Sequence, residues 1–166
     1  MRAVRGVGVD IVDLGAFAAS LAEPGTRLTR AFSAAERRQS RERAEARGAV
    51  AGERASSSSG SAAAGSRPAD PLARHLAARW AAKEAVIKAW SAALYGVPPP
   101  ISPDLLVWSE IETMCDAWGR PAVRLSGEVA RQVEATVGRD ARWNISLSHE
   151  SDSAVAFVVL EGSVPR

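Results

Sequence analysis

The chain has 166 residues, 46% of them hydrophobic, which predicts one globular domain over residues 1–166. Its 21 Lys and Arg against 19 Asp and Glu give a formal charge of only +2, too small to indicate a nucleic-acid-binding protein. Its one cysteine, Cys115, excludes an intramolecular disulfide and a cysteine-based zinc site, and no apolar run is long enough to span a bilayer. We therefore expect a cytoplasmic protein that binds neither nucleic acid nor membrane.

The first strand is predicted from Ala3 to Ile11, where β-branched residues alternate with glycine. One face of this strand carries Gly6, Gly8 and Asp10, and the opposite face carries β-branched side chains. Because glycine leaves room for another backbone or a ligand, we expect a close neighbour on the glycine face. Asp10 ends that open face.

A helix is predicted next, followed by a loop. Ser33 precedes Glu36 by three positions, which is the spacing of a capping box and predicts a helix up to about Arg47. Residues 48–69 are mostly Ala, Gly and Ser, with few side chains large enough to bury. We expect a disordered surface loop there.

The longest helix is predicted from Pro71 to about Leu94, because Asp70 fits an N-cap followed by proline at the first helical position. The helix carries a stripe of apolar residues that is interrupted by the ammonium of Lys83. The stripe recurs at steps of three and four and consists of Leu72, Leu76, Trp80, Lys83, Ile87, Trp90 and Leu94.

The C-terminal half is predicted to be mainly β-structure. Strands over residues 105–112 and 121–125 flank a turn at Gly119, and residues 126–137 have the pattern of a short amphipathic helix. Two β-like runs between residues 143 and 160 predict an antiparallel hairpin.

The long predicted helix carries two notable charged groups. Glu84 lies at the edge of the apolar stripe, one turn before Lys88; it is either half of a surface ion pair worth about 0.3 kcal/mol or a half-buried carboxylate of a site. The ammonium of Lys83 must either extend to the rim of the stripe or meet an anion. We expect a phosphate or a carboxylate as its partner.

Asp10 is either a turn or capping residue or a carboxylate that faces a cleft. Two carboxylates from distant segments suit Mg²⁺ when substrate phosphates and waters complete its shell, so Asp10 and Glu84 are candidate ligands if they meet. His149 follows Ile145 and Leu147 on one strand face, where a structural role is commoner than catalysis. The sequence contains no Ser-His-acid pattern, phosphate loop or dinucleotide fingerprint, which disfavours hydrolases and ordinary nucleotide-binding folds.

Five motifs in this order resemble holo-acyl-carrier-protein synthases of the 4′-phosphopantetheinyl transferase superfamily, especially the actinobacterial members. The likeness covers nearly the whole chain except the Ala/Ser/Gly segment, where family members usually have a shorter connection. The W-A-A-K-E-A motif is the most specific. The motifs are GVDIV at 8–12, FSAAE at 32–36, RWAAKEA at 79–85 with Lys88, WGRP at 118–121 and SLSH at 146–149.

The resemblance implies an α+β fold with a small antiparallel sheet packed with a long helix, assembled as a homotrimer with active sites between neighbouring subunits. It implies that Asp10 and Glu84 bind Mg²⁺ and that Asp10, Glu84 and Lys88 are catalytic. It further implies that one set of residues lies near coenzyme A, with Lys83 and Lys88 near its phosphates. That set is Arg79, Lys83, Gly119, Arg120, Pro121 and His149.

The implied reaction moves 4′-phosphopantetheine from coenzyme A to a serine of apo acyl carrier protein and releases adenosine 3′,5′-bisphosphate. Such a reaction supports fatty-acid or polyketide biosynthesis. A metal ion would neutralise charge on the pyrophosphate. The base is either Glu84 itself or a metal-bound water, and the sequence leaves this choice open.

Two other functions fit the sequence. The first is that of a non-catalytic module that binds coenzyme A or a carrier protein. The second is that of an interaction module whose Arg-rich segment 37–43 contacts an acidic partner. A charge run of this kind is usually a solvated helix face. The sequence does not identify the carrier protein or the subunit that supplies each site residue.

Overall fold

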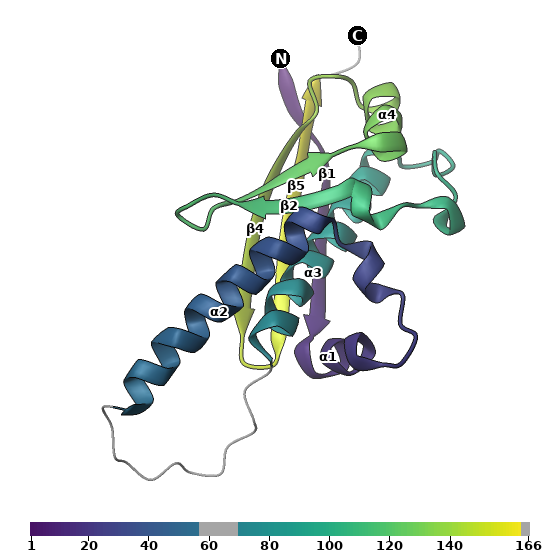
Figure 1. Cartoon of the computed structure of the whole chain (residues 1–166). Coiled ribbons are helices and arrows are strands. Elements are labelled where there is room, and N and C mark those ends of the chain that lie inside the picture. Colours follow the sequence, from purple (N-terminus) through teal and green to yellow (C-terminus); the bar gives the residue numbers. More distant parts are fainter. Residues whose placement is uncertain (57–69, 164–166) are drawn as a thin grey trace.

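Helix α3 lies at the centre of the fold, between a three-stranded sheet and the helices α1 and α2 (Figure 1). The computed structural model describes residues 1–56 and 70–163. Its elements in chain order are β1 (Arg2–Asp13), α1 (Leu14–Ala22), η1 (Leu28–Ala31), α2 (Ala34–Ser56), α3 (Pro71–Ala93), η2 (Pro103–Leu105), η3 (Trp108–Glu110), β2 (Ile111–Cys115), β3 (Pro121–Leu125), α4 (Gly127–Thr136), β4 (Arg142–Glu150) and β5 (Ser153–Ser163).

The main sheet has the strand order β1-β5-β4, and both pairings are antiparallel. Asp10 of β1 pairs with Ala156 of β5, which in turn pairs with Leu147 of β4. Strands β2 and β3 form a separate antiparallel hairpin. The predicted α+β class, with a small antiparallel sheet packed with a long helix, is confirmed.

Small residues allow α3 to approach β1 closely, as the glycine pattern predicts. A Cβ atom at Gly8 would overlap the carbonyl oxygen of Ala85 and lie 2.6 Å from the amide nitrogen of Ala89. Both alanines are fully buried. The helix backbone therefore lies directly on the strand, with no side chain between them.

The outer face of β1 and β5 is apolar and exposed. Val9 pairs with Phe157, and the two side chains are 50% and 47% exposed, respectively. Val4, Val7 and Ile11 are likewise exposed on β1. An apolar patch of this kind on a sheet is typical of a protein interface.

Both predicted helix starts are confirmed. The Ser33 amide donates to Oε2 of Glu36, and the Glu36 amide donates to Oγ of Ser33, which completes the capping box. The Asp70 side chain accepts from the amide of Leu72 at the start of α3. Among the described residues no helix has the length and apolar content needed to cross a membrane.

Two predicted segments differ from the structure. The predicted loop at 48–69 is helical as far as Ser56, because its Ala, Glu and Arg residues favour helix more than its glycines oppose it; residues 57–69 lie outside the described residues. The strand predicted over 105–112 is wrong. Short 3₁₀ turns lie at Pro103–Leu105 and Trp108–Glu110, and the strand runs from Ile111 to Cys115. The carbonyl of Trp108 accepts from the Lys83 ammonium and not from a neighbouring strand.

Replacing Gly8 by alanine should lower the free energy of unfolding by about 3 kcal/mol or more, because neither backbone in the contact can move aside. Urea unfolding measures the change. Gly48 is the matched control, since it lies in α2 and a Cβ added there would meet nothing within 4 Å. Gly48→Ala should raise stability by up to about 1 kcal/mol. Equal effects of the two substitutions would contradict the close approach of α3 to β1.

Candidate active site

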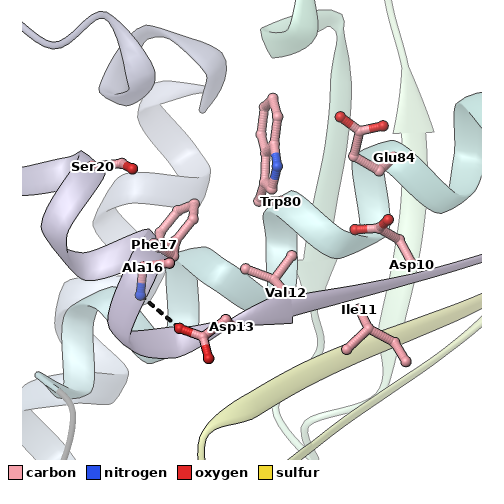
Figure 2. Close-up of a pocket in the computed structure, with 9 residues that line it drawn as sticks. All are labelled: Asp10, Ile11, Val12, Asp13, Ala16, Phe17, Ser20, Trp80 and Glu84. Carbon is pink, nitrogen blue, oxygen red and sulfur yellow. Dashed lines mark hydrogen bonds between the residues drawn. The ribbon is translucent and has the colours of Figure 1, made fainter.

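Asp10 and Glu84 meet where α3 crosses β1, at a hollow of about 450 Å³ also lined by Phe17 and Trp80. Figure 2 shows the side chain of Glu84 above that of Asp10, at the same end of the hollow. The ammonium of Lys88 lies 2.7 Å from Oδ1 of Asp10. Lys88 therefore pairs with Asp10, and the simple Glu84–Lys88 surface pair is not formed among the described contacts.

Burial, and next the negative charge of Asp10, raises the pKa of the Glu84 carboxyl, while Lys88 acts in the opposite direction. The raised pKa reflects first the burial of the carboxyl and second repulsion by the negative charge of Asp10. A bound cation would relieve this repulsion. The two carboxylates fit the protein share of a Mg²⁺ shell, which commonly includes one or two carboxylates with phosphates and waters. Within residues 1–56 and 70–163, no group of three or more His, Cys, Asp or Glu side chains could hold a metal ion.

Asp13 also lines this hollow, but it has a structural role. Its side chain accepts a hydrogen bond of 2.7 Å from the amide of Ala16 and caps α1, as Figure 2 shows. The capping bond keeps the Asp13 carboxylate at the start of α1, which leaves Asp10 and Glu84 as the other two carboxylates that line the hollow.

A second pocket, of about 480 Å³, collects four of the residues expected near coenzyme A: Arg79, Gly119, Pro121 and His149. The Arg79 guanidinium is buried and donates to the carbonyl of His75 at 3.1 Å and to Oε1 of Gln39 at 2.7 Å. Gln39 also bonds both the amide and the carbonyl of Cys115. These contacts hold the guanidinium in a fixed orientation at the pocket wall.

Arg120 lies beside this pocket without lining it. Its Nε lies 2.6 Å from Oδ2 of Asp116, and its guanidinium lies 4.8 Å from the centre of the Trp118 ring. Gly119 has a φ of 89°, which suits glycine in this tight turn. The structure therefore gives the Arg120 side chain a local partner in the turn.

Lys83 is fully buried, and its Nζ lies 2.8 Å from Oε2 of Glu36. It also donates to the carbonyls of Trp108 and Ile111. Burial lowers the pKa of Lys83, and the Glu36 carboxylate opposes that shift. The expected anion is thus a carboxylate. The assignment of Lys83 to the coenzyme A phosphates needs correction, because all three of its donors are already used within the fold.

The two groups of site residues lie on different sides of α3. Arg79 and Glu84 are five positions apart, which separates them by about 140° around the helix axis. Asp10 and His149 lie on β1 and β4, the two edge strands of the main sheet. One chain therefore presents two separate clusters: Asp10, Glu84 and Lys88 form the carboxylate cluster, and Arg79, Gly119, Pro121 and His149 form part of the arginine pocket.

Sequence reasoning missed three residues of the arginine pocket, namely Arg43, Arg47 and His75. The first two belong to the Arg-rich helix, which had the pattern of a solvated face. His75 precedes Arg79 by one helical turn, and that spacing was the available signal. Their positions depend on how α2 packs against α3, which local patterns do not specify.

Comparison with known proteins identifies the family. The model of the 4′-phosphopantetheinyl transferase superfamily matches residues 6–158. The chain belongs to this superfamily.

Two similar proteins are named holo-[acyl-carrier-protein] synthase. The holo-[acyl-carrier-protein] synthase of Corynebacterium glutamicum is 42% identical over 154 residues, covering 93% of this chain and 96% of that protein. The one from Mycobacterium ulcerans is 40% identical and covers 96% and 98%. A solved ACPS-CoA complex from Chronobacterium ammoniagenes is 38% identical, with a TM-score of 0.77 and 99% of both chains covered.

Replacing Lys83 by methionine should lower the free energy of unfolding by about 3 to 5 kcal/mol, because the Glu36 carboxylate would remain buried without its cation. Chemical denaturation measures this change. The matched control is Arg38→Met, which breaks an exposed pair with Glu42 at 4.0 Å and should cost at most about 0.5 kcal/mol. A Lys83→Met protein of normal stability with weakened coenzyme A binding would instead place Lys83 at the phosphates.

Proposed function

We propose that this protein is a holo-acyl-carrier-protein synthase that transfers 4′-phosphopantetheine from coenzyme A to a serine of apo acyl carrier protein. The observation that carries the proposal is the meeting of Asp10 and Glu84 beside Lys88 in a member of the phosphopantetheinyl transferase superfamily. The names of the similar proteins support acyl carrier protein as one substrate. The ACPS-CoA complex supports coenzyme A as the other.

Asp10 and Glu84 are the residues that would hold Mg²⁺ in this site. When bound, Mg²⁺ supplies positive charge that stabilises phosphate oxygens. The raised pKa of Glu84, caused by burial and by Asp10, supports a cation at this position. Lys88, whose side chain is half exposed, can turn from Asp10 to a substrate phosphate.

In the proposed reaction the carrier serine hydroxyl attacks the β-phosphorus of coenzyme A. The bond between that phosphorus and the bridging oxygen breaks, and adenosine 3′,5′-bisphosphate leaves with the bonding electron pair. Glu84, directly or through a water, accepts the serine proton. Lys88 supplies positive charge where negative charge develops on the phosphates.

Asp10→Ala and Glu84→Ala should each reduce transfer by at least about a hundredfold, because each removes one of two carboxylates. Mass spectrometry of an apo carrier protein incubated with coenzyme A and Mg²⁺ measures the added phosphopantetheine. Glu134→Ala, which removes an α4 carboxylate that pairs with Arg139, is the control and should keep full activity. Coenzyme A binding without transfer by the wild-type protein would favour the non-catalytic alternative.

The proposed assembly is a homotrimer in which the carboxylate cluster of one subunit faces the arginine pocket of the next. Two observations support it: the two clusters lie on different sides of α3, and the outer face of β1 and β5 leaves Val9 and Phe157 exposed. A head-to-tail contact repeated three times closes a ring and makes three equivalent sites.

A mixture of Asp10→Ala and His149→Ala chains, unfolded and refolded together, should regain activity at about one site in four, because one subunit then supplies an intact carboxylate cluster and its neighbour an intact arginine pocket. Asp10→Ala with Glu84→Ala should regain nothing, since both residues belong to the same cluster. Sedimentation reports the assembly state. A fully active monomer, or recovery by the second mixture, would contradict this arrangement.

The carrier protein belongs to fatty-acid or polyketide biosynthesis in this proposal, and the cytoplasm is the proposed compartment. The single cysteine is compatible with a reducing environment. The exposed Arg38 and Arg41 of α2 suit an acidic carrier surface, since opposite charges speed encounter and select the partner.

A further inference from the structure

The arginine pocket contains two buried nitrogen atoms that have no hydrogen-bond partner among the described residues. They are Nε of Arg79 and Nε2 of His75. Arg79 as a whole is only 3% exposed, and both residues line the pocket. A buried polar group left without a partner costs about 1 to 3 kcal/mol. A ligand in the pocket that supplies acceptors would satisfy both nitrogens once the two side chains turn toward it.

The charge of the pocket specifies that ligand as an anion. Arg43 and Arg47 face it from α2, Arg79 from α3 and His149 from β4. Cys115 is the titratable group contributed by β2, and no carboxylate of the described residues lines the pocket. Guanidinium groups bind phosphate oxygens through paired, charge-assisted hydrogen bonds.

We propose that His75 is a further ligand of a phosphate group bound in this pocket and that it takes up a proton when the phosphate binds. The identity of the phosphate as part of coenzyme A rests on the proposed function, whereas the proton uptake does not. His75 lies one turn from Arg79 on α3, so both side chains can reach the same phosphate.

The charges around His75 explain the coupling. Burial, and next the positive charges of Arg79 and Arg47, lower the pKa of His75 to about 4, so the imidazole is neutral at pH 7. A phosphate bound among the arginines offsets their charge and raises the pKa toward neutrality. Binding therefore favours the imidazolium, and affinity should rise as the pH falls from about 8 to about 6.

Calorimetric titration with adenosine 3′,5′-bisphosphate in two buffers of different ionisation enthalpy measures protons taken up per ligand bound. At a pH of about 6.5 the wild-type protein should take up more protons than His75→Gln. The ligand's own phosphate also titrates near this pH, and the difference between the two proteins removes that contribution. His75→Gln keeps a donor and should lose affinity less than about threefold, whereas His75→Leu should lose about tenfold.

Equal proton uptake by the wild-type and His75→Gln proteins would overturn the proposal. His149 lines the same pocket and is the competing proton acceptor. The proposal would also be overturned if His149→Gln lost the proton uptake while His75→Gln retained it. Dephospho-coenzyme A and coenzyme A, titrated in parallel, distinguish the 3′-phosphate from the pyrophosphate as the group bound. Proton-linked binding without transfer to a carrier protein would contradict the proposed function and leave the role of His75 intact. Transfer to a carrier without His75-dependent proton uptake would contradict the role of His75 and leave the proposed function intact.

Discussion

The rest of the structure depends on the close contact between α3 and β1. Gly8 lies against the backbone of Ala85 and Ala89, and this contact sets both the depth and the rotation of α3 on the sheet. Glu84 is adjacent to Ala85 and therefore emerges at the side of β1, next to Asp10. A larger residue at position 8 would push the helix away and separate the two carboxylates.

The buried pair of Lys83 and Glu36 organises the opposite side of α3. Glu36 caps α2 through Ser33, accepts from the amide of Thr113 and pairs with Lys83. One carboxylate thus joins α2, α3 and the β2–β3 hairpin. A buried pair of this kind adds little net stability relative to apolar packing, but loss of one partner is costly, so it specifies one arrangement of the three elements.

Since α3 lies at the centre, residues close together in its sequence reach different surfaces. Trp80 and Glu84 line the carboxylate hollow, while His75 and Arg79 line the arginine pocket. In one chain the two clusters therefore lie on separate surfaces, as the proposed assembly requires. The exposed apolar face of β1 and β5 is the kind of surface on which the proposed contact between chains could form.

The sequence by itself determined most of the elements, because caps, glycine patterns and alternation are local signals. The capping box at Ser33, the start of α3 at Asp70 and the two-faced first strand follow directly from them. The sequence also identified Asp10 and Glu84 as candidate metal ligands through motif resemblance. Local signals were weaker at residues 48–56, where glycine disfavours a helix and alanine favours one.

Only the tertiary structure decided which side chains meet, because contacts between distant segments depend on how the helices pack. It paired Lys83 with Glu36 rather than with a ligand, and placed Lys88 against Asp10. It also brought His75 into the arginine pocket. The identity of an anion beside a buried cation is a property of the packed elements, and no spacing within one helix specifies it.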